Sequence, residues 1–160
     1  MFKSTKRAKR PSKPLEYALR LLAQRAYTEK KLTEKLESRE VGAEEIKKAT
    51  HNLKELGYID DAKFAKDFVE NAQGIRLTGK RKIYWQLIKK GVSKETAETA
   101  ISQSYVEDDE GEAVAYIIKK YARSIPKDKL YERLTRRLIS RGYDYSVVKQ
   151  KVADFLKSND

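Results

Sequence analysis

Apolar residues recur at helical spacing through most of the chain, and the pattern is clearest between Gly57 and Gly91. There the apolar side chains follow an i, i+3, i+4 spacing, which places them on one face of a helix. A first series is Phe64, Ala65, Phe68, Val69 and Ala72, and a second series is Ile83, Tyr84, Leu87 and Ile88. Gly74 separates the two series, so this stretch predicts a helix, a basic connector and a second helix.

Local signals mark the ends of these two helices. Gly57 suits a left-handed helix C-cap, and the Asp60-Asp61 pair can accept hydrogen bonds from the free N–H groups of a new helix. Lys89 and Lys90 place positive charge in the last turn before Gly91, where the helix dipole favours it. Both ends of this stretch therefore carry helix-capping or helix-terminating residues.

Similar apolar stripes flank this stretch on both sides. Three stripes precede Gly57: Leu15, Ala18, Leu19, Leu22, Ala23 and Ala26; Leu32 and Leu36; and Ile46, Ala49, Leu53 and Leu56. Four stripes follow Gly91: Ala97, Ala100 and Ile101; Val114, Ile117, Ile118 and Tyr121; Leu130, Leu134 and Leu138; and Val147, Val148, Val152 and Phe155. Thr28 and Glu29 can start one of these helices, Ser93 can cap another, and Asp144 or Ser146 the last.

A shift of 51 residues superposes the middle and last helices of three successive groups. Four columns are apolar in all three copies: Leu32, Ile83 and Leu134; Leu36, Leu87 and Leu138; Val41, Val92 and Tyr143; and Ile46, Ala97 and Val148. Gly91 likewise falls on Gly142. The first helix of each group fits the shift poorly, so the connector that follows it must vary in length.

These patterns predict an all-α fold of three tandem three-helix repeats, nine helices in all, in an elongated curved array. The repeats are expected at residues 15–58, 59–106 and 107–157. Residues 1–14 carry six cations, two prolines and no acid, and they are expected to form a basic disordered arm. No sheet is predicted.

Composition narrows the class of protein. Charged residues make up 38% of the chain and hydrophobic residues only 39%, which confines the apolar side chains to one stripe per helix. The chain has no Cys, so disulfides and thiolate metal sites are excluded. No leader-like apolar region or run of about 20 apolar residues occurs. A soluble cytoplasmic protein is expected.

The net charge of +12 is unevenly distributed and points to a polyanionic partner. Between Gly74 and Lys94 there are seven cations and no acid, and between Lys119 and Arg141 there are nine cations against Asp128 and Glu132. The residues expected to contact phosphate are Arg76, Lys80, Arg81, Lys82, Lys89, Lys90, Arg133, Arg136, Arg137 and Arg141. Alternatively, each cation only solvates a helix face, and the arginines of the last group pair with acids such as Glu132.

Several segments resemble the RecX family of regulators of RecA recombinase. The resemblance rests on Arg25-Ala26-Tyr27-Thr28, the joint LGYIDDAKFA, Gly79 with Ile83 and Leu87, the segment KKGV, and RGYDY near the end. It covers residues 15–156. Family members often carry two glycines in the loop before the middle helix, and here Leu77 occupies the earlier of these two positions.

The resemblance implies a protein without enzymatic activity and without cofactors. It implies binding to the RecA filament on single-stranded DNA, with weaker non-specific binding to duplex DNA, and restraint of strand exchange, ATP turnover and co-protease activity. A curved row of helices with a cationic face is a plausible filler for the groove of such a filament. A monomer without membrane contact is expected.

Other candidate chemistry is weaker. Tyr84 lies on an apolar stripe and is expected in the core, whereas Trp85 lies off it and either packs across a repeat boundary or stacks on bases. His51 is the only histidine and has no second His or Cys with which to form a metal site. The acidic run Glu107 to Glu112 is interpreted as helix capping rather than Mg²⁺ binding. No Ser-His-Asp grouping, phosphate-binding glycine loop or dinucleotide fingerprint is present.

Two other functions remain open from the sequence. A basic chain of helix trios is compatible with a helix-turn-helix transcription factor, although no trio groups Asn, Gln and Arg for base contacts. The second alternative function is a helical-repeat protein scaffold that has no nucleic-acid role. Binding that weakens steeply with salt and shows little sequence preference would favour the filament regulator over both.

Overall fold

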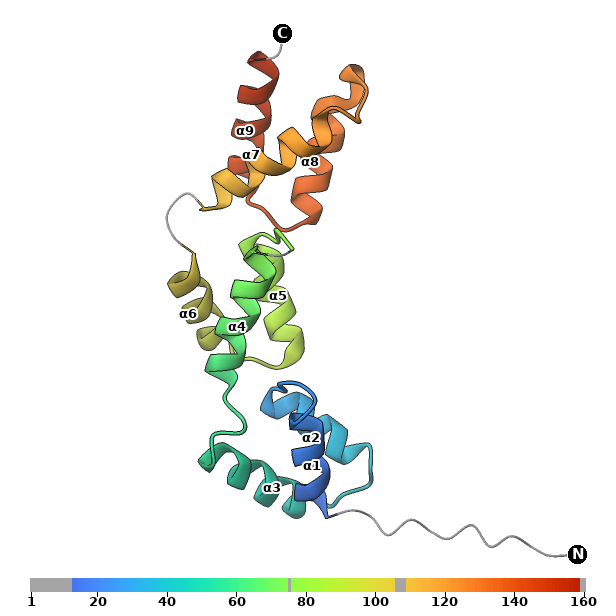
Figure 1. The fold of residues 1–160 in the computed structure, drawn as a ribbon, viewed down its shortest axis with the longest axis vertical. Coiled ribbons are helices and arrows are strands. Elements are labelled where there is room, and N and C mark those ends of the chain that lie inside the picture. Colours follow the sequence, from blue (N-terminus) through green and yellow to red (C-terminus); the bar gives the residue numbers. More distant parts are fainter. Residues whose placement is uncertain (1–12, 75, 106–108, 159–160) are drawn as a thin grey trace, which may run out of the picture. The chain divides into compact units, whose positions relative to one another are not determined.

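The computed structural model describes residues 13–74, 76–105 and 109–158 (Figure 1). These ranges contain nine α-helices, one short 3-10 helix and no strand. The all-α prediction is confirmed. The predicted arm lies outside the described residues up to residue 12, and the first helix begins at Pro14.

The chain divides into two compact units, residues 1–60 and 61–160. The first unit contains α1 (Pro14–Leu22), α2 (Glu29–Glu37) and α3 (Ala43–Glu55). The second contains α4 (Asp61–Gly74), α5 (Lys80–Lys90), α6 (Lys94–Ser104), α7 (Asp109–Ala122), the 3-10 helix η1 (Lys127–Lys129), α8 (Leu130–Ser140) and α9 (Tyr145–Lys157). The boundaries of three separate repeats stay a prediction.

The buried side chains of the described residues group into three hydrophobic clusters. The first unit has one cluster, centred on Ala18, Leu32, Leu36, Ile46, Leu53 and Ile59. The second unit has two clusters: Ala65, Val69, Ala72, Ile83, Leu87, Val92, Ala97 and Ala100 from α4 to α6, and Val114, Ile117, Ile118, Leu130, Leu134, Leu138, Tyr143, Val148 and Val152 from α7 to α9. Each cluster is small, as expected where nearly two residues in five are charged.

The 51-residue repeat is visible in the helix starts. The last helix of each trio begins at Ala43, Lys94 and Tyr145, at intervals of 51 residues. Ser93 and Asp144 cap α6 and α9 with their side chains, as predicted, since they accept hydrogen bonds from Thr96 N and Ser146 N. The columns Leu32, Ile83 and Leu134 and Leu36, Leu87 and Leu138 are completely buried.

Two predicted apolar stripes are longer than the buried faces. Ala23 and Ala26 are exposed because α1 ends at Leu22 and the chain turns towards Thr28, which caps α2. Leu56 is 68% exposed. The chain turns after α3 through the left-handed Gly57, and Ile59 takes the place in the core that the periodicity assigned to Leu56.

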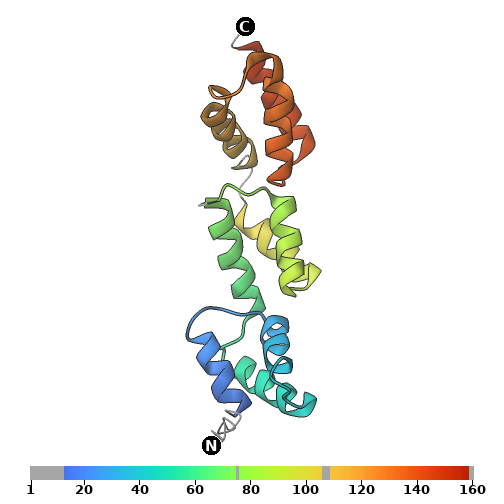
Figure 2. The ribbon, with the colours of Figure 1, turned by 90° about the vertical axis from the view of Figure 1, so that its right-hand side faces the viewer.

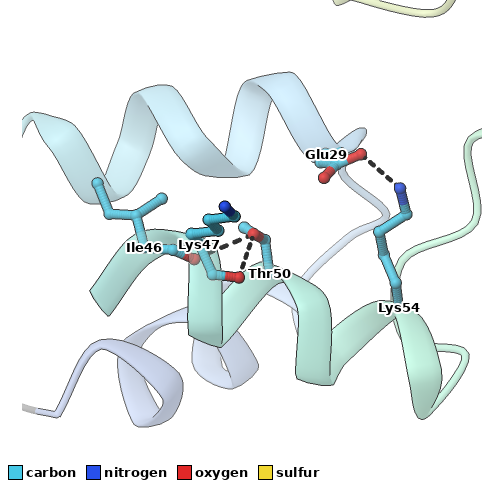
Figure 3. A network of polar contacts seen from close by, with 5 residues as sticks. All are labelled: Glu29, Ile46, Lys47, Thr50 and Lys54. Atoms are coloured by element: carbon cyan, nitrogen blue, oxygen red, sulfur yellow. Dashed lines mark hydrogen bonds and ion pairs between the residues drawn. The ribbon is translucent and has the colours of Figure 1, made fainter. Parts of the chain in front are cut away.

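Polar contacts in the first unit join α2 to α3 and satisfy a buried hydroxyl (Figure 3). The Lys54 ammonium lies 2.7 Å from a Glu29 carboxylate oxygen. The buried Thr50 hydroxyl donates to the carbonyl oxygens of Ile46 and Lys47, at 3.0 and 3.2 Å. Such bonds offset the cost of burying a polar group inside the helix.

The middle helix of each trio ends in the same left-handed turn. Its residues are Glu40, Gly91 and Gly142, with φ of 59°, 92° and 87°. In each copy the next residue donates its N–H to the carbonyl five residues earlier, at 3.5, 3.1 and 3.4 Å. This bond is the mark of a Schellman ending, which favours glycine because a Cβ is strained at positive φ. Only the first copy carries a side chain there.

We expect Glu40→Gly to stabilise the first unit. The left-handed conformation costs a residue with a Cβ about 1–2 kcal/mol, and the added freedom of glycine in the unfolded chain removes part of the gain. A net increase of about 0.5–1 kcal/mol in the free energy of unfolding should be seen by urea denaturation. Glu40→Ala is the control, because it removes the carboxylate and keeps the Cβ. An equal gain in both variants would show that charge, not φ, is responsible.

Candidate nucleic-acid interface

In the second unit the loop before α5 packs against the turn between α8 and α9 (Figures 1 and 2). The contact is between backbones: Gly79 N donates to Arg141 O at 2.9 Å, and Arg81 N donates to Gly142 O at 3.2 Å. A Cβ on Gly142 would lie 2.3 Å from Cβ of Lys82, and one on Gly79 would lie 2.4 Å from the Gly142 carbonyl carbon. Only glycine fits at these two positions, so we call this contact the glycine junction.

Three side chains reinforce the glycine junction. Arg141 Nη1 donates to Arg76 O at 3.0 Å, and the Lys82 ammonium donates to Ser140 O at 3.1 Å. Tyr143 Oη donates to Leu77 O at 2.8 Å. Burial raises the pKa of Tyr143 to about 12, so this phenol remains a neutral donor across the physiological range. Cations at the C-terminal end of α8 are also favoured by its dipole.

Glu110 of α7 caps the start of α5 from outside that helix. Its Oε1 accepts the Lys80 N–H at 3.3 Å, one of the N–H groups that α5 cannot pair internally. Burial raises the pKa of this carboxyl, and the hydrogen bond from Lys80 opposes that shift. The acidic run was interpreted as capping, and for Glu110 the capped helix is α5. Glu107 and Asp108 lie outside the described residues.

Four predicted arginines line one pocket beside the glycine junction. The pocket has a volume of about 700 Å³ and is lined by Ser124, Ile125, Arg133, Arg136, Arg137, Ser140 and Arg141. Lys82 does not line the pocket itself, but its ammonium donates to the carbonyl oxygen of Ser140, which does. We call Lys82, Arg133, Arg136, Arg137 and Arg141 the basic cluster. Guanidinium groups around one hollow can bind a phosphate through paired hydrogen bonds.

Contacts with neighbouring side chains hold two members of the basic cluster in place. The Arg137 guanidinium lies over the Tyr121 ring, 4.0 Å from its centroid. Arg136 pairs with Glu132, the acid that the sequence offered as an alternative partner. Both side chains of this pair are well exposed, and an exposed pair contributes little, so an incoming phosphate can replace it.

The remaining predicted cations lie apart from the basic cluster. Lys80 lies over the Tyr105 ring at 4.8 Å, and Lys80 and Arg81 line a second pocket of about 680 Å³ that also contains Glu110 and Asp144. Lys90 lies over Phe64 and Phe68, at 5.8 and 5.4 Å, and Lys89 is exposed on α5. Arg76 contributes its carbonyl to the glycine junction and exposes its side chain. The ten predicted residues therefore divide into several groups.

Tyr84 and Trp85 of α5 lie in different environments. Tyr84 is half-buried and packs against the cluster of α4 to α6, as predicted. Trp85 remains 62% exposed, which removes the packing alternative within the second unit. His51 is exposed, and no three acidic or histidine side chains group as metal ligands within the described ranges. None of the helices in that part of the chain is both long and apolar enough to cross a membrane.

Several residues of the glycine junction carry no sequence signal of their role. The sequence pattern predicts only that Gly142 ends a helix and that Tyr143 lies in the core. Glu110, which caps α5 nearby, is only one acid in an acidic run. Leu77 stands where members of the resembled family often have glycine, and its φ of 48° shows that the backbone there is left-handed. That departure from the family pattern was the one available hint of an unusual loop.

Comparison with known proteins identifies the family. The family models described as the first and second three-helix domains of RecX match residues 15–53 and 60–101. A protein named Regulatory protein RecX from Chlorobium phaeobacteroides (strain BS1) is 31% identical over 148 residues, which are 91% of this chain and 95% of that protein. The chain belongs to the RecX family.

Other RecX proteins agree with this assignment. The regulatory protein RecX of Caldanaerobacter subterraneus subsp. tengcongensis is 33% identical over 128 residues. The match covers 80% of this chain, which spans only 63% of the length of that relative. The crystal structure of RecX from Lactobacillus salivarius has the same fold, with a TM-score of 0.80 at 22% identity and coverage of 91% of this chain and 96% of that one. These relatives are named as regulators rather than as enzymes.

We expect Gly142→Ala to destabilise the second unit far more than Gly57→Ala destabilises the first. Both glycines have positive φ, but a Cβ on Gly57 meets nothing within 4 Å. Gly57→Ala should therefore cost only the conformational strain, about 1 kcal/mol, whereas Gly142→Ala adds a backbone clash and should cost about 2–4 kcal/mol. Urea denaturation measures both costs. Equal costs would mean that the glycine junction opens without penalty.

We expect Glu110→Gln to stabilise the protein at pH 7 and to lose this advantage in acid. The folded protein raises the pKa of Glu110 above its ordinary value of 4.5, so burial of the charged form weakens the fold above that pKa. As the pH falls through the raised pKa and then below 4.5, the wild-type carboxyl becomes protonated in both states and the penalty progressively disappears. Gln keeps an oxygen that can accept from Lys80 N. The free energy of unfolding between pH 3.5 and 7 tests this, and a difference that grows on acidification contradicts it.

Proposed function

We propose that this RecX family member binds a RecA filament assembled on single-stranded DNA and restrains its strand exchange, ATP hydrolysis and co-protease activity. Family membership supports the recombinase as partner. The observation that carries the DNA contact is the basic cluster, in which four arginines surround one hollow. Arginine binds phosphate with two parallel hydrogen bonds, and clustered cations release counterions when they neutralise a DNA backbone.

The glycine junction supports a positioning role for this cluster. Arg141 reaches the α4–α5 loop and Lys82 reaches α8, so the cluster includes side chains from two helix trios of the same unit. A site built on a rigid contact holds its cations in place before the ligand arrives, which reduces the entropy lost on binding. Lys80, Arg81, Lys89, Lys90 and Arg76 are proposed as additional phosphate contacts outside the basic cluster.

We further infer a monomeric, cytoplasmic protein that acts by binding and carries out no chemistry of its own. Residues 107–157 are proposed as the third three-helix domain, following the two that the family models cover. Oligonucleotide binding tests whether the protein lacks sequence preference on DNA, and ATP hydrolysis measured without RecA tests whether it has no catalytic activity of its own. Sequence-specific binding would favour a transcription factor instead.

We expect the triple variant Arg133→Ala, Arg136→Ala, Arg137→Ala to lose most of its effect on RecA. RecA-driven ATP hydrolysis on single-stranded DNA should fall when the wild-type protein is added, and the variant should need about tenfold more protein for the same effect, because it lacks about two phosphate contacts. Changing the exposed Lys48, Lys149 and Lys157 to Ala removes equal charge elsewhere and serves as the control.

Two results separate the parts of this proposal. Unchanged ATP turnover on addition of the wild-type protein contradicts the regulatory function. Equal inhibition by the triple variant and the charge control contradicts only the site. The plot of log affinity for an oligonucleotide against log salt should also become less steep, by about 0.7 for each lost contact, in the triple variant.

A further inference from the structure

Trp85 is the one large exposed aromatic residue of α5, and it is the only tryptophan of the chain. Ile83 and Leu87 of the same helix are completely buried. Since residues two positions apart on a helix are separated by about 200°, Trp85 projects almost directly away from the core. Beyond its contact with Tyr84, a tryptophan so placed contributes little to the packing of the second unit, which calls for another explanation.

Cations flank Trp85 along α5, and one of them, Arg81, also lines the pocket that contains Glu110 and Asp144. Arg81 and Lys89 lie four residues before and after Trp85, and positions separated by four share a face and differ in height by about 6 Å. Both side chains are exposed, and α5 contains no acid at all. An aromatic ring between two cations is the combination with which proteins hold single-stranded nucleic acid, with the base on the ring and its phosphates on the cations.

The indole also has a defined support. Its ring meets Tyr84 edge to face, with centroids 5.3 Å apart and planes at 80°. Tyr84 itself is packed against the cluster of α4 to α6. Contact with an anchored neighbour limits the rotation of the indole, while 62% of the residue remains exposed to a ligand.

We propose that Trp85 is a stacking platform for an unpaired base, flanked by Arg81 and Lys89 as phosphate contacts. The inference deepens the proposed function and rests on its binding of single-stranded DNA. A protein partner is the competing occupant, because Trp and Arg are also frequent at protein interfaces. Charge favours the nucleic acid, since two exposed cations flank the ring on a helix that contains no acid, and cations so spaced can bind a strand of phosphates. Bases in a duplex are already stacked on one another and do not reach the ring, so the platform selects single strands.

Because Trp85 is the only tryptophan, its intrinsic fluorescence can report base stacking without a label on the protein. Titration with oligo(dT) in the absence of RecA should quench the fluorescence of Trp85, whereas an abasic oligonucleotide of equal length and a duplex of the same length should leave it largely unchanged. The abasic strand keeps the phosphates, so it separates stacking from charge attraction. Binding of each nucleic acid is followed in parallel by the anisotropy of a labelled strand.

Variants test the energetic contribution. Trp85→Ala should weaken binding of oligo(dT) about tenfold, while Trp85→Phe, which keeps a ring, should weaken it about threefold or less. Tyr58→Ala is the matched control, because Tyr58 is 56% exposed but stands near Asp60 and Glu55 instead of between cations, and it should bind like the wild type.

Each outcome decides one question. If oligo(dT) binds without quenching and Trp85→Ala binds equally well, stacking is wrong and the proposed DNA binding stands. If Trp85→Ala binds DNA normally but no longer inhibits RecA, the face docks on the recombinase and the base platform is wrong. If no strand binds at all, both this inference and the proposed DNA contact are overturned.

Discussion

The close approach of two backbones at the glycine junction brings Lys82 of α5 up to the end of α8, the helix that carries the arginines. Gly79 and Gly142 allow the start of α5 to reach the turn after α8, where Gly79 N donates to Arg141 O and Arg81 N donates to Gly142 O. The backbones are then so close that neither glycine has space for a Cβ. Once this contact exists, Arg141 can reach the carbonyl of Arg76 and Lys82 can reach that of Ser140. Two cations of the basic cluster, Lys82 and Arg141, are thus oriented by hydrogen bonds to backbone carbonyls, which salt weakens less than it weakens ion pairs.

The small number of apolar residues explains why the glycine junction is important in the second unit. Each of the three hydrophobic clusters is small, and much of the chain is charged, so few apolar side chains are available to join one helix trio to the next. Backbone hydrogen bonds supply that joint in the second unit, aided by Leu77, which packs against the cluster of α7 to α9 and whose carbonyl accepts from Tyr143. Its left-handed φ of 48° is unfavourable for leucine, and the packing and hydrogen bonds around it offset that strain.

Periodicity in the sequence was sufficient to predict the helices and their buried faces, because burial in a helical trio follows the 3.6-residue repeat directly. The columns that begin at Leu32 and Leu36 are buried in all three copies. Local periodicity failed where a turn redirects the chain, as when Ile59 takes the expected place of Leu56. The candidate site was predicted less well: Arg133, Arg136 and Arg137 do gather, but the separation of Lys80 and Lys90 from them depends on contacts far apart in sequence. A backbone contact such as that of Gly79 with Gly142 has no compositional mark beyond the glycines themselves.

Gly142 forms the left-handed turn that ends α8, and its carbonyl accepts a hydrogen bond from Arg81 at the start of α5. Because one residue makes both contacts, the length of α8 is fixed. An insertion or deletion of one residue inside that helix would rotate its far end by about 100°. The arginines of α8 would then face a different direction from the turn that holds them against α5. The loop before α5 is held in the same contact through Arg76, Leu77 and Gly79, so its length is fixed as well. The connectors ahead of α2 and α8 take no part in the glycine junction, and insertions should therefore accumulate there, while the span from α8 to α9 stays constant in length.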